Sequence, residues 1–347
     1  MWGDSMIRKA CLALALVASL AAGGWWFLHK GGGSAPDIGF YHWKTVYSPG
    51  PAAEETLRLL KTPRLYVRFF DVKVEDGRPA PVATAIFLQT PALPVVPVVF
   101  VDEELMRFRS SGPEWLAPRL VDRVNEMIAQ NKLTTAKELQ LDCDWTAGSR
   151  ESFFALVREV KKTVPADWAV SVTLRLSQYR DFAEAGVPPA DRAALMLYNM
   201  GQLRAFGDHN SILDAAVAAN YLKPVSYPLP LDVALPLFSW GVVFDRDKNY
   251  RGLARELPPN LSDPAAFERI SPLMYKALKP LRWNGNGMYA GEYLRVERTE
   301  PAELDKVVKQ AAQALGPVKT VIFYHLDEAV MAPYSKDVLQ NAADALR

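Results

Sequence analysis

Eight short apolar runs, spread from residue 38 to residue 325, constrain the fold of this chain more than any other sequence feature. Most are almost continuously apolar, which is typical of strands that are buried on both faces of a sheet. Amphipathic segments with a helical period lie between many of them. The expected strands are Ile38–Trp43, Leu65–Asp71, Val95–Val101, Glu138–Asp144, Ala169–Arg175, Ala193–Asn199, Leu231–Phe238 and Thr320–His325. The expected helices are Ala52–Leu60, Trp115–Ile128, Ser152–Lys162, Ser211–Ala219 and Pro301–Leu315.

This alternation predicts an α/β fold, a (β/α)8 TIM barrel that spans residues 37–347. A doubly wound open sheet is the alternative, but no glycine-rich dinucleotide fingerprint follows any of the runs. The gap between the seventh and eighth runs is much longer than the others and contains Gly285-Asn286-Gly287 and the alternating segment Met288–Val296. We therefore expect an insertion between strands 7 and 8 that carries a small hairpin.

Residues 1–36 form a separate N-terminal region with the features of a targeting segment. Arg8-Lys9 precede an apolar run, Ala10–Leu28, and a membrane span needs roughly 17–25 such residues. The positive flank predicts a cytosolic N-terminus, whereas the small residues of Ser19-Leu20-Ala21 would also fit a cleaved signal peptide. In both cases the barrel is exported, as a periplasmic or secreted protein, and residues 10–28 anchor it to the inner membrane if they are retained. Gly31–Ser34 then serves as a flexible tether.

Charge and cysteine content exclude some classes of function. The chain has 40 basic and 39 acidic side chains and no basic stripe, so we expect no nucleic-acid partner. The two cysteines, Cys11 in the apolar segment and Cys143 on the fourth strand, form no disulfide framework. We expect Cys143 to be a small core residue. No motif indicates a cofactor.

Two aspartates end the fourth predicted strand. Asp142 and Asp144 are two residues apart, so on a strand they point to the same side. Two carboxylates that share one side of a buried strand are costly unless they are paired or used. The carboxyl end of a barrel strand is where barrel enzymes place their active sites. The structural alternative is that arginines such as Arg68 and Arg175 neutralise both acids.

Polar and aromatic residues gather at the carboxyl ends of the other predicted strands as well. Aromatic faces beside carboxylates suit sugar rings, which stack on aromatic side chains while their hydroxyls hydrogen-bond to polar groups. His42 and His325 lack the spacing of metal ligands, so we expect no metal. The candidate residues, besides the two aspartates, are Tyr41, Trp43, Arg68, Asp102, Glu103, Trp145, Tyr198, Asn199, Trp240, Tyr324, His325, Asp327 and Glu328.

With these residues the chain resembles the family-18 glycoside hydrolases, the chitinase-like barrel proteins. The fourth-strand signature of that family, D-x-x-D-x-D-x-E, reads here Leu139-x-x-Asp142-x-Asp144-x-Thr146. The segment Leu141–Thr146 also resembles a family of bacterial exported proteins of unknown function that are related to these hydrolases. The other matching motifs, in chain order, are Gly39–Trp43, Met196–Asn199, Leu235–Gly241 and Phe323–Asp327.

The resemblance implies roles for the matching residues, and one departure from the family pattern. In those enzymes the last Glu of the signature is the general acid, the preceding Asp orients the substrate acetamide that acts as nucleophile, and a sixth-strand Tyr steadies the oxazolinium. By position, Asp144 would orient the acetamide and Tyr198 would steady the intermediate. Thr146 occupies the place of the proton donor, and acid catalysis contributes about 10²–10⁴-fold. The family mechanism therefore fails as written.

Three functional hypotheses remain, and the first is a polysaccharide hydrolase with a reassigned acid. Its two carboxylates would lie roughly 5–9.5 Å apart. The second is a catalytically inactive carbohydrate-binding protein, and the third is a membrane-tethered scaffold. For the hydrolase, the candidate catalytic residues are Asp142, Asp144, Tyr198 and Asn199, with Glu103 or Glu328 as replacement acids, and the other candidates bind the substrate.

Overall fold

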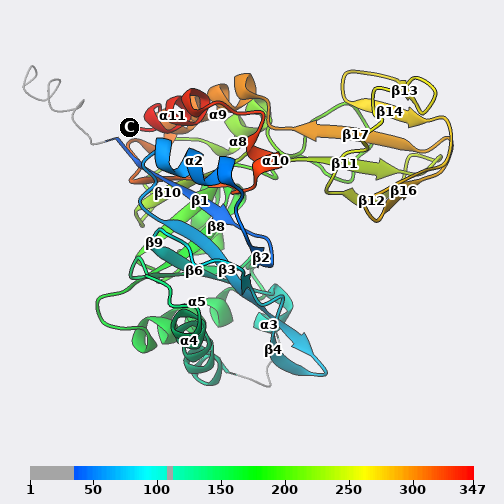
Figure 1. Cartoon of the computed structure of the whole chain (residues 1–347). Coiled ribbons are helices and arrows are strands. Elements are labelled where there is room, and N and C mark those ends of the chain that lie inside the picture. Colours follow the sequence, from blue (N-terminus) through cyan, green and yellow to red (C-terminus); the bar gives the residue numbers. More distant parts are fainter. Residues whose placement is uncertain (1–34, 108–111) are drawn as a thin grey trace, which may run out of the picture.

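The computed structural model describes residues 35–107 and 112–347, and its central element is a closed barrel of eight parallel strands (Figure 1). Strand β1 closes the barrel because it pairs with both β18 and β3. In barrel order the strands are β1 (Asp37–His42), β3 (Leu65–Glu75), β6 (Val95–Val101), β7 (Glu138–Asp142), β8 (Ala169–Arg175), β9 (Arg192–Met196), β10 (Leu231–Pro236) and β18 (Thr320–Tyr324). All eight predicted strands and the (β/α)8 fold are confirmed.

The five predicted helices are also present. The last of them begins at Pro301 and ends before Gly316, whose φ of 71° is the left-handed conformation that suits a glycine after a helix. The five helices are α2 (Pro51–Leu59), α4 (Pro113–Gln130), α5 (Arg150–Thr163), α8 (Ala215–Tyr221) and α9 (Pro301–Leu315). Further helices are α3 (Glu103–Arg107), α6 (Leu176–Arg180), α7 (Phe182–Ala185), α10 (Glu328–Met331) and α11 (Lys336–Asp344).

The predicted anchor or signal at residues 10–28, and the tether that follows it, lie outside the described residues. Within residues 35–107 and 112–347, no helix combines the length and the apolar character needed to cross a bilayer.

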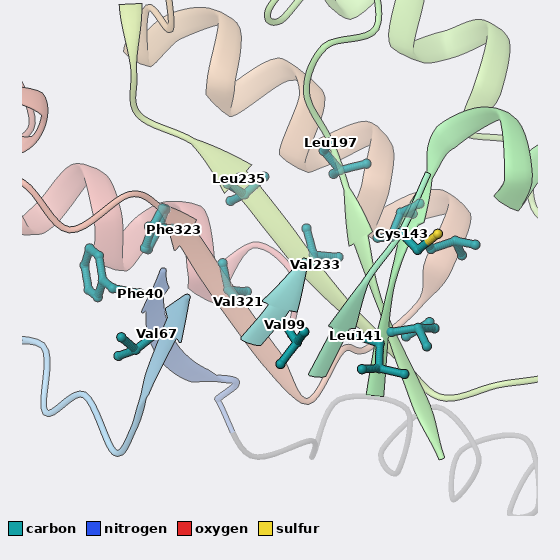
Figure 2. Packing of buried hydrophobic residues seen from close by; sticks show 14 of the residues in the cluster. Phe40, Val67, Val99, Leu141, Cys143, Leu197, Val233, Leu235, Val321 and Phe323 are labelled. Atoms are coloured by element: carbon teal, nitrogen blue, oxygen red, sulfur yellow. The ribbon is translucent and has the colours of Figure 1, made fainter. Parts of the chain in front are cut away.

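The outward side chains of the barrel strands form the main core, beneath the surrounding helices (Figure 2). Phe40 on β1 and Phe323 on β18 pack with their ring centroids 5.5 Å apart. Leu141 and Cys143 are fully or almost fully buried on this side, as predicted for Cys143. Because side chains alternate along a strand, this packing directs Asp142 and Asp144 toward the barrel interior.

A chain of buried polar side chains crosses the inside of the barrel below these aspartates. The Tyr41 hydroxyl donates to Oε1 of Gln140 at 2.6 Å, and the Gln140 amide donates to Ser171 at 3.2 Å. The Ser171 hydroxyl in turn donates to Glu138 at 2.6 Å, and Glu138 is ion-paired with Arg192 at 3.3 Å. These bonds satisfy the polar groups inside the barrel and give the interior a fixed floor.

The predicted insertion between the seventh and eighth barrel strands is a second sheet. It contains five antiparallel strands in the order β12-β11-β17-β14-β13 and projects from the barrel in Figure 1. The predicted hairpin is the smaller pair β15 (Leu281–Trp283) and β16 (Asn286–Met288), which is joined by Asn284 and Gly285, both with positive φ. The five strands are β11 (Ser239–Phe244), β12 (Tyr250–Ala254), β13 (Phe267–Arg269), β14 (Met274–Ala277) and β17 (Tyr293–Arg298).

The insertion is larger than the sequence indicated because several of its strands are too short to show an alternating pattern. β13 has three residues and β14 has four. The remaining strands lie beside the barrel: β2 (Val46–Tyr47) pairs with β5 (Ile86–Phe87), and β4 (Arg78–Val82) extends β3.

A fully buried ion pair on β17 fixes the inserted sheet to the barrel. Nε of Arg295 lies 2.6 Å from Oε1 of Glu297. The Arg295 guanidinium also donates to carbonyl groups of loop 203–207 at 2.5 to 3.4 Å. Oε2 of Glu297 accepts hydrogen bonds from Ser211, at 2.9 and 2.6 Å, and from the Trp240 indole at 2.8 Å. The pair therefore joins β17, β11 and the loop that follows β9.

We expect Glu297→Ala to lower the free energy of unfolding by about 3–5 kcal/mol, because it leaves the buried Arg295 charge without its partner. Urea unfolding of the full chain measures the change. Glu268→Ala, an exposed position on β13 of the same insertion, is the matched control and should change stability by less than about 0.5 kcal/mol. Equal effects of the two substitutions would contradict the role of the buried pair.

Candidate active site

An open cavity of about 1220 Å³ lies at the carboxyl ends of the barrel strands, and the inserted sheet forms part of its wall. Most of the candidate residues from the sequence line it. They are Tyr41, Trp43, Arg68, Asp142, Asp144, Tyr198, Asn199, Trp240, Tyr324, His325 and Asp327. The closed barrel thus brings together side chains that are up to about 280 residues apart in the chain, as expected for the carboxyl rim of this fold.

Four candidate residues lie outside the cavity lining, and two of them have clear structural contacts. Trp145 is buried in the core, where it stacks on Phe153 at 5.3 Å and donates its indole hydrogen to the carbonyl of Ala185. The Asp102 carboxylate accepts a hydrogen bond from the backbone N–H of Glu104 at 3.0 Å, at the start of α3. Asp102 therefore caps a helix, as the acids at a helix start often do.

The two acids that the sequence suggested as replacement donors, Glu103 and Glu328, are also bound outside the cavity. Glu103 accepts a hydrogen bond from the Thr146 hydroxyl at 2.7 Å and lies 2.8 Å from Arg107. Partial burial opposes ionisation, but these bonds outweigh it and lower the pKa of Glu103. Glu328 accepts from the backbone N–H of Ala52 at 2.7 Å, at the start of α2. Both carboxylates are therefore used as hydrogen-bond acceptors outside the cavity.

Asp142 has a different environment, at the base of the cavity. Its Oδ1 accepts a hydrogen bond from the Thr173 hydroxyl at 2.5 Å, and it forms no ion pair among the described residues. Burial raises the pKa of Asp142 to about 7; the bond from Thr173 opposes this shift, and the negative charge of Asp144 adds to it. Asp142 is thus a carboxylic acid that holds its proton near neutral pH and faces an open cavity.

Three other acids of the cavity, Asp71, Asp144 and Asp327, are each paired with a base. Asp144 lies 2.5 Å from Arg175, as the structural alternative for this acid predicted. Asp71, within β3, forms a two-pronged ion pair with Arg68, at 2.6 and 2.5 Å. Asp327 pairs with Lys44. Arg68 therefore neutralises Asp71, its neighbour on β3, and not Asp142.

Tyr324 stands at the centre of a group of aromatic rings. Its ring centroid lies 5.6 to 6.0 Å from those of Tyr41, Trp43, Tyr198 and Phe238. Burial raises the pKa of the Tyr198 phenol, and the nearby Tyr324 adds to the shift, so Tyr198 retains its proton as a hydrogen-bond donor. Rings at such distances form an apolar wall beside the carboxyl groups.

The rim histidine, His325, also lines the cavity. Burial lowers the pKa of His325 to about 4, since the Asp327 carboxylate does not fully offset it. The imidazole is therefore uncharged at neutral pH.

Several residues of the cavity were not among the sequence candidates. Thr173 lies two residues before Arg175 on β8, so strand alternation alone would have placed both on the inner face with Asp142. Phe238 follows β10 directly and was included in the predicted strand without a role. Arg255 comes from the inserted sheet, and no sequence signal connects that segment with the barrel rim.

No protein-family model matches the chain, and no curated protein matches its sequence. Solved structures do match its fold. The spore cortex-lytic enzyme SleL of Bacillus cereus is 11% identical with a TM-score of 0.53, over 91% of this chain and 76% of that one. A chitinase from Bacteroides thetaiotaomicron is 11% identical with a TM-score of 0.53, over 89% of this chain and 97% of that one. The chain therefore has the fold of the chitinase-like glycosidases, which confirms the resemblance at the level of fold.

Asp142 should make stability depend on pH. Its pKa is about 7 in the folded chain, against 3.8 ordinarily, so the folded state binds more protons between these values and loses stability as the pH rises through them. We compare the free energy of unfolding of Asp142→Asn with that of the native chain. The difference should change in favour of the variant by up to about 1.36 kcal/mol for each pH unit in this range, and it should stay constant above the range. Urea unfolding at about pH 4, 5, 6, 7 and 8 measures the difference, and a flat difference would contradict the assignment.

Proposed function

We propose that this protein is a glycoside hydrolase that cleaves a polysaccharide in the cavity, with Asp142 as the proton donor. The observation that carries the proposal is the state of Asp142: a carboxyl group without an ion pair among the described residues, whose pKa burial raises to about 7, at the base of an open cavity. A general acid works best when its pKa lies near the working pH. The fold, shared with chitinases and a spore cortex-lytic enzyme, agrees with this chemistry.

In the proposed reaction Asp142 transfers its proton to the oxygen of the scissile glycosidic bond, so that the leaving sugar departs as an alcohol. The positive charge that develops on the other sugar ring is then stabilised by the Asp144 carboxylate, which faces the same cavity two residues beyond Asp142. A water molecule adds to that ring, and the proton that it loses returns to Asp142. The two acids differ in environment, because burial raises the pKa of Asp142, which has no ion pair among the described residues, whereas Asp144 is paired with Arg175. Such a difference separates an acid from an ionised partner in many glycosidases.

The neighbouring side chains would bind and orient the sugar. Trp43, Trp240 and Tyr324 present ring faces or edges to the cavity, where they can pack against the apolar faces of sugar rings. The Tyr198 hydroxyl and the Asn199 amide can hydrogen-bond to sugar hydroxyls or to the developing charge. Asn199 has a φ of 54° and is fixed by the bond from its backbone N–H to the carbonyl of Ile212 at 2.9 Å.

Two contacts argue that this reaction differs from the one the resemblance implies. Asp144 would have to orient a substrate acetamide, but Arg175 holds its carboxylate at 2.5 Å. Thr146, at the place of the family's donor, binds Glu103 outside the cavity lining. Proton donation from Asp142 needs neither group.

We also propose that the enzyme acts outside the cytoplasm. The support is the sequence alone: an apolar run over residues 10–28 behind a positive flank, followed by a glycine-rich tether. If the run is retained, it anchors the barrel to the inner membrane, and if it is cleaved, the barrel is released into the periplasm or secreted.

A carbohydrate-binding protein without activity is the second candidate. It is favoured by the ion pairs of Asp71, Asp144 and Asp327, because a carboxylate that is bound to a base is a weaker catalytic base than a free one. Turnover separates the two candidates.

We expect Asp142→Asn to reduce hydrolysis by about 10²–10⁴-fold, because asparagine has the same shape and no proton to give. The full-length chain, purified in detergent, is screened against a panel of polysaccharides by reducing-end release. In the native chain the rate should also fall above about pH 7, where Asp142 loses its proton.

The matched control is Asp102→Asn, at the rim but outside the cavity. Asparagine keeps the hydrogen bond to the backbone of Glu104, so activity should stay within a factor of about two. Native binding of an oligosaccharide without turnover would favour the binding protein. Full activity of Asp142→Asn would refute the assigned donor.

A further inference from the structure

The inserted sheet brings an unpaired guanidinium to the cavity. Arg255 directly follows β12, is exposed, and lines the cavity without an ion pair among the residues that the structure describes. The positive charge of Arg255 affects Tyr324. Burial raises the pKa of Tyr324, and the charges of Arg255 and Arg68 both oppose that shift. Tyr324 therefore lies within the electrostatic range of two guanidinium groups from different parts of the fold.

Among the described residues, no acid of the cavity forms an ion pair with this guanidinium. Three of its bases, Arg68, Arg175 and Lys44, are already paired with Asp71, Asp144 and Asp327. Lys73 is 3.9 Å from Asp71, whose two oxygens both accept from Arg68.

Two acids of the lining remain outside these pairs. Asp142 is uncharged below about pH 7. Glu256, next to Arg255, accepts a hydrogen bond from the side chain of Asn284. Besides Asp142, the lining thus holds five bases and four acids.

We infer that the substrate of this site is an acidic polysaccharide, in which a sugar carboxylate is bound by Arg255 beside Tyr324. This inference rests on the proposed function and deepens it. A guanidinium presents a planar pair of donors that matches the two oxygens of a carboxylate. The rings around Tyr324 add an apolar surface on which the sugar that carries this carboxylate can pack.

The anchoring of the insertion supports a role in recognition. Arg255 directly follows β12, which pairs with β11, and β11 pairs with β17, where the buried Arg295–Glu297 pair lies. The same Glu297 binds the Trp240 indole in the cavity wall. A guanidinium on a sheet fixed in this way loses less freedom on binding than one on a mobile loop.

The experiment measures binding of acidic oligosaccharides to the full-length chain by isothermal titration calorimetry. The probes are fragments of polygalacturonate, alginate and hyaluronan, each compared with the same fragment after reduction of its carboxyl groups to alcohols. We expect at least one acidic fragment to bind more tightly than its reduced form, by about tenfold or more, and to lose this advantage at high salt.

Arg255→Gln should weaken binding of that acidic fragment by about 10- to 100-fold and leave the reduced fragment unchanged. The matched control is Arg282→Gln, an exposed arginine on β15 of the same insertion that is not part of the cavity lining, and it should have no effect. Equal binding of acidic and reduced fragments, no binding of any fragment, or equal effects of the two substitutions would overturn the inference.

The outcomes also separate this inference from the proposed function. If binding depends on Arg255 but the bound fragment is not hydrolysed, the proposal of a hydrolase is refuted and the inference of an acidic ligand still holds. If a neutral polysaccharide is hydrolysed, and the rate depends on Asp142 but not on Arg255, the inference of an acidic substrate is refuted and the proposal of a hydrolase still holds.

Discussion

The pairing of β1 with both β18 and β3 is the constraint on which the rest of the structure depends, because it turns a row of parallel strands into a closed barrel. Closure brings the carboxyl ends of all eight strands to one rim. Closure also gives every strand an outer face, which packs under helices, and an inner face, whose side chains fill the barrel or line a binding site. At the end of β7 and in the two residues after it, this division buries Leu141 and Cys143 outside and leaves Asp142 and Asp144 inside. The two carboxyl groups face the cavity because Leu141 and Cys143, which alternate with them, pack into the apolar core outside the barrel.

The chemistry of the site follows from how its charges are distributed. Three of the cavity aspartates, including Asp144, have a basic partner, which lies on the same strand for Asp71 and on another strand or loop for Asp144 and Asp327. Asp142 has only the Thr173 hydroxyl, and a hydroxyl offsets little of the cost of burying a charge. Burial therefore prevails and the proton stays on Asp142, although Asp144, two residues away, carries its charge beside Arg175. The contrast arises from Thr173 and Arg175 on β8, since one offers a neutral donor and the other a cation.

Much of this arrangement could be predicted from sequence, and the remainder has identifiable physical reasons. The barrel strands were recognisable because each is a run of apolar residues buried on both faces, and the aspartates because two acids at the end of such a run are unusual. The ion pair between Asp144 and Arg175 was foreseen as an alternative. The partner of Arg68 was not foreseen, since the choice between Asp71 and Asp142 depends on a bulge in the pairing of β3 with β6 after Arg68.

The size of the insertion was underestimated because β13 and β14 are very short. Arg255 could not be assigned to the site because the three-dimensional path of the inserted sheet brings it there.

The inserted sheet and the departure at Thr146 can be understood together. In the family that the chain resembles, the residue at this position supplies the proton, but here Thr146 binds Glu103, so that edge of the rim is occupied by a contact between the starts of α3 and α5. In the proposed reaction the proton comes instead from Asp142, and the substrate is held from another wall of the cavity. That wall is the insertion, which contributes Trp240 and Arg255 and is fixed to the loop after β9 by Glu297 and Arg295. Loss of the usual donor therefore need not mean loss of activity, because the closed barrel offers a second carboxyl group and the insertion offers a second way to position the sugar.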